Sequence, residues 1–255
     1  MVSLETYYIS GIPIPLDDIG FINQPKIKDY ISKGISIEEF IQPFLVRLDN
    51  TTGFDDNKNL MELKKYLLDF DLLFLKNGDE FLFKDKSGTL LDKLLVSLEL
   101  LYNTKDVVLN YEEQCIIIKG KHRINRLNYT KLADIVLEMC QTKKPEKPNN
   151  KPKYKDKHRQ QLWEKLERKR AEEAKKKALT LADIINIVVH IKDFYTYENV
   201  INMTYYQLLN TYQVMMNKMS YDEFLMFKSS GQFEIKQEVK HWTTTTKINR
   251  STLKI

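Results

Sequence analysis

The sequence has few of the residues that mark secreted, metal-binding or membrane-spanning proteins. Its 255 residues include only two cysteines, Cys115 and Cys140, and four widely separated histidines. Neither a disulfide framework nor a Cys/His metal site is therefore predicted. No apolar run approaches the roughly 18 residues that a transmembrane helix needs, and the N-terminus lacks the pattern of a secretory signal. We expect a soluble protein of a reducing cytoplasm, without a membrane partner.

Sequence motifs of catalysis are also absent. There is no Gly-rich phosphate loop, no G-x-S-x-G and no H-E-x-x-H. One acidic pair, Asp17-Asp18, lies within the stretch GIPIPLDDIG, where two carboxylates could hold a metal. No further ligand follows nearby, and adjacent residues of a strand point to opposite faces. The pair is better interpreted as a turn, followed by a helix that Gln24-Pro25 begins. The sequence predicts neither an enzyme nor a cofactor.

The positive charge is concentrated in one segment. Residues 142–178 hold 15 lysines or arginines against 6 acidic residues, a net of +9, whereas the other 218 residues hold 25 basic and 29 acidic groups. Prolines and lysines predict a solvated linker first and a charged helix after it. A connector is favoured, because glutamates interrupt the positive face. A nucleic-acid arm is the alternative; its basic side chains would be Lys151, Lys153, Lys155, Lys157, Arg159, Arg168 and Arg170.

This segment divides the chain into four predicted parts. They are a mainly helical N-terminal domain with a small sheet (1–140), the basic linker and charged helix (141–178), a helical C-terminal domain (179–242) and a flexible tail (243–255). The predicted fold class is α+β, mainly α.

Local patterns predict the elements of the N-terminal domain. Leu4–Ser10 and Ile12–Leu16 are expected to pair as strands across Gly11, and a capping box at Ser36 begins a helix that Pro43 interrupts. The remaining predictions are core helices over 60–76 and 89–102, a hairpin of 107–109 with 114–119, and a helix over 130–140 that Asn128 caps.

In the C-terminal domain, Thr180 is expected to cap a helix over 184–191 and Thr204 a second one. Ser220 is expected to begin a last helix. Met-rich and aromatic helices can offer an adaptable surface to a helical partner, although core packing is favoured for any single residue. The candidate partner-binding residues are Trp163, Tyr205, Leu208, Tyr212, Met215, Met216 and Trp242.

Several short stretches together resemble one protein family. They are YISGIPIPLDDIG at residues 8–20, a Trp163-containing Lys/Glu helix, LTLADII at 179–185, MTYYQL at 203–208 and KHW at 240–242. From about residue 7 to 242 the chain resembles tail-assembly chaperone-like proteins of tailed phages that infect Gram-positive bacteria. It departs from their pattern at Met203, where leucine is expected, and in its threonine-rich end.

The resemblance implies a non-enzymatic role in the cytoplasm of the bacterial host. Such proteins are thought to coat the tape-measure protein and keep it soluble while tail-tube subunits assemble around it. The implied partners are therefore the tape-measure protein and the tail-tube protein, and self-association of the chain is a further expectation. The alternative function is that of a nucleic-acid-binding accessory protein that uses residues 143–177.

Overall fold

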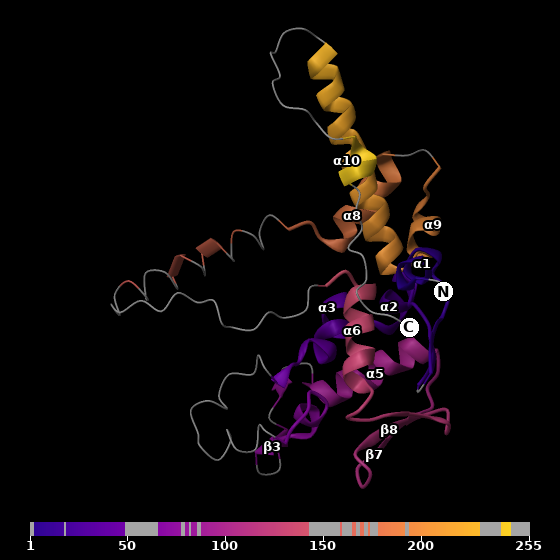
Figure 1. Cartoon of the computed structure of the whole chain (residues 1–255), viewed down its shortest axis with the longest axis vertical. Helices are drawn as coiled ribbons and strands as arrows, with labels where there is room; N and C mark the ends of the chain where they lie inside the picture. The colour runs from indigo at the N-terminus through magenta and orange to yellow at the C-terminus, as the bar shows by residue number, and fades with distance from the viewer. Residues whose placement is uncertain are drawn as a thin grey trace.

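The protein combines many helices with small antiparallel sheets, as a computed structural model shows (Figure 1). The predicted α+β, mainly α class is thus confirmed. The structure describes residues 3–17, 19–48, 66–77, 80–81, 83–85, 88–142, 178–191, 194–229 and 241–245, with isolated positions between 159 and 173.

The N-terminal segment is a helix, so the strand predicted there is wrong. In α1 (Leu4–Ser10) the Ser3 side chain accepts the N–H of Thr6, and Gly11 ends the helix with a φ of 69°. Leu4 and Tyr8 are both buried, and their separation of four residues places them on the same face of a helix. The many β-forming residues of this short run favoured the prediction of a strand. The strand β1 (Ile14–Leu16) pairs instead with β2 (Gly20–Ile22).

The acidic pair lies at the tip of this hairpin. Asp17 is in the turn between β1 and β2, and Asp18 lies outside the described residues. The following helix α2 (Ile27–Lys33) has Lys26 as its N-cap. Pro25 therefore precedes the helix and does not belong to its first turn, which corrects the start predicted at Gln24-Pro25.

The next helix begins and breaks as predicted. Ser36 and Glu39 form a reciprocal capping box at the start of α3 (Ile37–Ile41). The chain then tightens into the 3₁₀-helix η1 (Gln42–Leu45), which contains Pro43, because proline removes a backbone donor.

The core helix predicted over 60–76 is wrong where it can be checked, since residues 60–65 lie outside the described part. The chain forms η3 (Asp71–Phe74) and β3 (Lys76–Asn77), which pairs with β4 (Glu80–Phe81). Asp71 accepts the backbone N–H of Leu68 at 2.7 Å, and such a local bond competes with a continuous helix. A second short pair, β5 (Lys84–Asp85) with β6 (Gly88–Thr89), follows.

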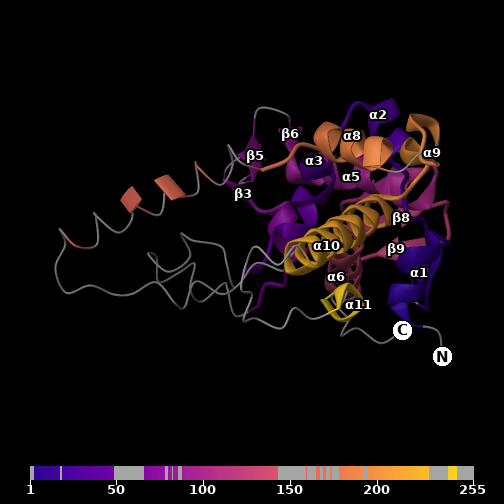
Figure 2. The same cartoon turned by 90° about the horizontal axis from the view of Figure 1, so that it is seen from above.

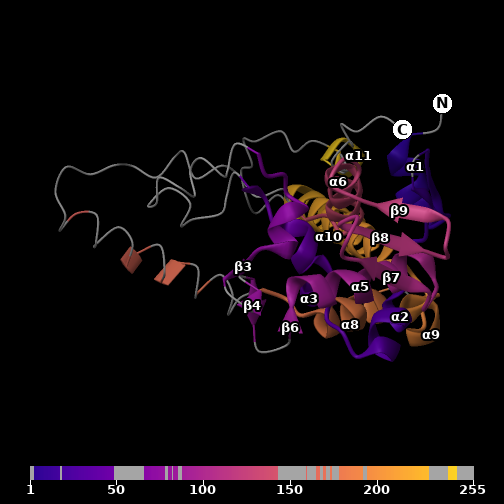
Figure 3. The ribbon, with the colours of Figure 1, turned by 90° about the horizontal axis from the view of Figure 1, so that it is seen from below.

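Two long helices and a sheet complete the N-terminal part. The helix predicted over 89–102 is α5 (Leu90–Tyr102), and Thr89 is its N-cap. The predicted hairpin is β7 (Val107–Asn110) with β8 (Cys115–Ile118), and β9 (His122–Ile124) adds a third strand beside β8. Figure 3 shows this sheet beside α5. Helix α6 (Tyr129–Met139) follows Asn128, whose side chain accepts the N–H of Asn125 and does not cap α6.

The C-terminal part consists of α8 (Leu181–Ile191), α9 (Tyr197–Ile201), α10 (Tyr205–Ser229) and α11 (Trp242–Thr245). The predicted caps are present, with Thr180 paired to Asp183 and Thr204 to Gln207. The helix start predicted at Ser220 is wrong, because α10 continues through it without a glycine or proline. Residues 243–245 of the predicted tail belong to α11.

The N-terminal and C-terminal parts pack directly on each other. Ile27 of α2 is fully buried among α8, α9 and α10 residues, and Tyr206 of α10 is buried in the N-terminal core. The backbone N–H of Ile27 donates to the carbonyl of Met203 at 2.9 Å. Figures 1 and 2 accordingly show α1 and α2 close to α9 and α10. The domain boundary within 141–178 stays a prediction, since residues 143–158 lie outside the described part.

Candidate functional site

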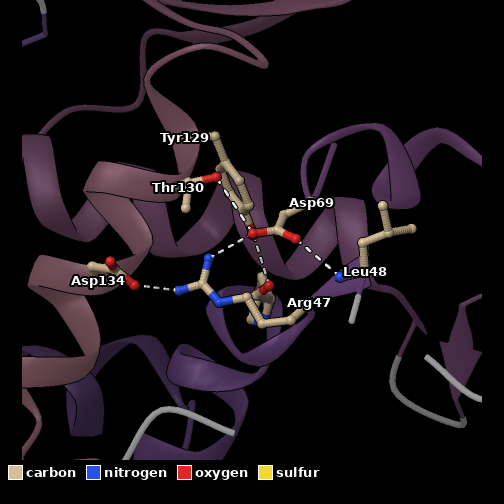
Figure 4. A network of polar contacts seen from close by, with 7 residues as sticks. Arg47, Leu48, Asp69, Tyr129, Thr130 and Asp134 are labelled. Carbon is tan, nitrogen blue, oxygen red and sulfur yellow. Dashed lines mark hydrogen bonds and ion pairs between the residues drawn. The ribbon is translucent and has the colours of Figure 1, made fainter. Parts of the chain in front are cut away.

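A network of polar contacts surrounds Arg47 (Figure 4). Its guanidinium donates to Asp69 at 2.9 Å and to Asp134 at 2.6 Å. Asp69 also accepts the backbone N–H of Leu48 at 2.9 Å and the hydroxyl of Thr130 at 3.4 Å. These contacts join the segment after η1, the turn before η3 and the helix α6.

This cluster has a structural role, because its ion pairs and hydrogen bonds hold three segments of the N-terminal part together. All three charged side chains are largely buried, and the two carboxylates share the single guanidinium of Arg47, which stabilises both of them in place. Close by, the hydroxyl of Tyr129 donates to the carbonyl of Pro43 at 2.7 Å, and burial raises the pKa of that phenol. In the part of the chain that the structure describes, no group of three or more His, Cys, Asp or Glu side chains could hold a metal.

The main candidate surface is on α10. Leu208 and Met215 are buried against Ile184 and Val188 of α8, so they pack within the chain, as core packing requires. Tyr205, Tyr212 and Met216 are partly buried beside them, and burial raises the pKa of Tyr205 to about 12. Of the seven candidate partner-binding residues, these five come together on one helix.

The apolar stripe of α10 continues beyond its partner helix. At 1.5 Å per residue, the 25 residues of α10 span about 37 Å, but the 11 residues of α8 span only about 16 Å. Met219 and Met226 follow Met215 on the same helical face, and their exposed fractions are 37% and 71%. Figure 1 shows the last turns of α10 standing clear of the other described helices, with the yellow α11 beside the middle of α10.

The two remaining candidate partner-binding residues are Trp163 and Trp242. Trp163 lies outside the described residues. Trp242 is partly buried next to His241, and its helix α11 contacts α10. Sequence reasoning missed Met219 and Met226. Their spacing from Met215 was visible, but their exposure depends on where α8 ends in space.

Two of the seven predicted basic residues belong to the part of the chain that the structure describes. Lys151, Lys153, Lys155, Lys157 and Arg168 lie outside the described residues. Arg159 and Arg170 are described, and both are exposed. Elsewhere, among the helices that the structure does describe, none combines the length and the apolar character needed to cross a membrane.

Comparison with known proteins places one part of the chain. Residues 173–247 match a family model described as the YomV second domain, a phage-type family from the Bacillus phage SPBc2 region. The match overlaps the predicted C-terminal domain 179–242 and includes α8 to α11. No curated protein and no solved structure matches the chain.

Proposed function

We propose that this protein is a phage tail-assembly chaperone that binds the tape-measure protein through α10. The observation that carries the proposal is the apolar stripe of α10, which is buried as far as Met215 and exposed at Met219 and Met226. The match of residues 173–247 to a phage-type family supports the phage context, and the resemblance in sequence supplies the role in the tail.

The physical basis is recognition of one helix by another. An amphipathic helix binds a partner through apolar residues that recur every three to four positions, and unbranched methionines adapt to different side chains. A long helical client presents many similar faces, so a stripe of this kind can bind it at several places. Asp222, seven residues after Met215, lies on the same face between Met219 and Met226, and Lys218 neutralises it through an ion pair of 2.9 Å.

Co-expression tests the proposal. The tape-measure protein of the same phage, expressed with this chain, is expected to stay soluble and to co-purify with it, whereas alone it precipitates. Met226→Asp places a charge in the stripe and is expected to lower the recovered client roughly tenfold. Ser220→Asp, at an exposed position of the same helix, is the matched control and should leave recovery unchanged. If the client's solubility does not depend on this chain, the proposal fails.

Nucleic-acid binding by residues 143–177 is the second candidate, and the exposed Arg159 and Arg170 are consistent with it. It predicts retention on immobilised DNA or RNA that falls steeply with salt and disappears when 143–177 is deleted. Deleting that segment leaves α10 intact, so the two functions can be separated. No retention at low salt would reject this candidate.

A further inference from the structure

The short helix α11 is seated on the long helix α10. The rings of Tyr221 and His241 lie 4.9 Å apart and meet edge to face at 66°. Trp242 lies next, with its ring centroid 5.7 Å from that of His241. A 2.8 Å hydrogen bond between the Nδ1 of His241 and the Oγ1 of Thr243 fixes the imidazole relative to α11.

This contact is on a different side of α10 from its buried stripe. At 3.6 residues per turn, Tyr221 is turned about 120° away from Met215, and Figure 2 shows α8 and α11 on opposite sides of α10. Val214, Tyr221, Phe224 and Leu225 share this side by helical spacing; we call these four residues the Tyr221 face. It is distinct from the stripe of Met219 and Met226.

We propose that the Tyr221 face is a binding surface for a helix with aromatic anchors in a protein partner, and that α11 occupies it in the free chain. The proposed function supplies only the class of partner, a helical protein. The residue before α11 supplies the chemistry, because the ring of His241 meets Tyr221 edge to face, the geometry that ring quadrupoles favour.

The seated helix leaves room for a longer one. Tyr221 and Trp242 are only partly buried, and Leu225 keeps 43% of its surface exposed. The four residues of α11 span about 6 Å, whereas the Tyr221 face from Val214 to Leu225 spans about 17 Å at 1.5 Å per residue, so α11 is too short to cover that whole face. A partner helix of several turns would bury the rest of the Tyr221 face and so displace α11.

Tryptophan fluorescence tests the contact without any partner. Trp163 and Trp242 are the only tryptophans, so Trp163→Phe makes Trp242 the single reporter. In that background Tyr221→Ala is expected to shift the emission of Trp242 to longer wavelength and to raise its quenching by acrylamide. Ser220→Ala, the neighbouring exposed position, should change neither. Circular dichroism confirms that α10 remains helical, and equal emission in both variants overturns the seating of α11.

Two synthetic amphipathic helices of equal length then serve as partners, one with phenylalanine and one with alanine at its apolar anchors. Phenylalanine is silent under excitation of tryptophan. The phenylalanine helix is expected to bind roughly tenfold more tightly and to expose Trp242 to acrylamide, and Tyr221→Ala should remove both effects. Equal affinity for the two helices, or binding that leaves Trp242 unchanged, overturns the inference. Neither result bears on the solubility of the tape-measure protein, which tests the proposed function separately.

Discussion

At the scale of single residues, a buried hydroxyl without a hydrogen-bond partner among the described residues lies at the junction between α1 and α10. The rings of Tyr8 and Tyr206 lie 5.2 Å apart. The hydroxyl of Tyr8 has acceptors in the carbonyl of Ile135 at 3.4 Å and the carboxylate of Glu138 at 3.5 Å. The hydroxyl of Tyr206 is buried without a hydrogen-bond partner. An unpaired buried hydroxyl is destabilising, so the two tyrosines should respond oppositely to loss of their oxygen.

Tyr206→Phe is therefore expected to stabilise the protein. Removing the unpaired hydroxyl should raise the free energy of unfolding by about 1 kcal/mol, which corresponds to a Tm higher by about 2–4 °C for a chain of this size. Tyr8→Phe is the matched control, and it should lower the free energy of unfolding because it removes the hydrogen bonds to Ile135 and Glu138. Differential scanning calorimetry measures both changes. A lower Tm for Tyr206→Phe would contradict the assignment.

The raised pKa of Tyr206 predicts that the folded protein loses stability at alkaline pH. Burial raises the pKa of Tyr206 from 10.0 to about 12, so the folded state holds this proton at a pH where the unfolded chain releases it. Its contribution to stability is complete below pH 10 and is lost as the pH rises from 10 through 12.

Urea denaturation at pH 9, 10 and 11 measures this dependence. The free energy of unfolding is expected to fall less steeply above pH 10 in Tyr206→Phe than in the parent chain. Tyr111→Phe removes an exposed phenol elsewhere and should leave the slope unchanged. Equal slopes for the parent and Tyr206→Phe would show that Tyr206 does not titrate differently in the folded state.

At the scale of elements, the start of α10 does two jobs. Thr204 and Gln207 cap each other through bonds of 2.9 and 3.2 Å. The amide of Gln207 also donates to the carbonyl of Ile9, the penultimate residue of α1, at 2.8 Å. The N-cap of α10 therefore also positions α10 against α1.

Thr204→Ala tests this double role. Loss of an N-cap typically costs about 1 kcal/mol, and the displaced Gln207 should add to that cost because its bond to Ile9 weakens. Thr196→Ala removes a comparable N-cap from α9, where Thr196 accepts the N–H of Asn199 at 3.2 Å. Urea denaturation should show the larger loss of stability for Thr204→Ala. Equal losses would mean that Gln207 holds α1 independently of the cap.

Elements that depend on residues a few positions apart could be predicted from the sequence. Elements that depend on packing against distant parts of the chain could not. The caps at Ser36, Thr89, Thr180 and Thr204 each depend on a partner three residues away, so their pattern is visible in the chain. The prediction of a strand for Leu4–Ser10 is wrong because a stretch of seven residues is too short to distinguish the 3.6-residue period of a helix from the two-residue period of a strand. The break predicted at Ser220 was wrong because serine is tolerated within a helix.

The candidate surface on α10 also combines a feature that is local in the sequence with one that depends on distant residues. The apolar spacing of α10 could be predicted, but the division into buried and exposed parts could not. Leu208 and Met215 are buried because α8 and Ile27 cover them, and Met219 and Met226 are exposed because α8 does not extend so far. The point at which α8 ends in space therefore decides which methionines can meet a partner.

At the scale of the whole molecule, the N-terminal and C-terminal parts share their cores. Ile27 is fully buried in the core of α8, α9 and α10, and Tyr206 is buried in that of the N-terminal helices. The backbone also crosses the junction, through the bond from Ile27 to Met203 and the antiparallel bridge of Lys26 with Thr204. Contacts of this kind do not depend on the covalent connection through residues 143–158.

The two parts should therefore stay together when that connection is cut. A protease site inserted between residues 149 and 150, within the predicted linker, allows cleavage under native conditions. We expect the two fragments to co-elute in size-exclusion chromatography, because separating them would expose Ile27 and Tyr206 to water, at a cost of about 1.5–3 kcal/mol for each large apolar side chain. Ile27→Asp places a charge in the C-terminal core and should let the cleaved fragments separate, whereas Ile31→Asp, at an exposed position of α2, should not. Separation of the unmodified fragments would instead mean that the linker alone keeps the two parts in contact.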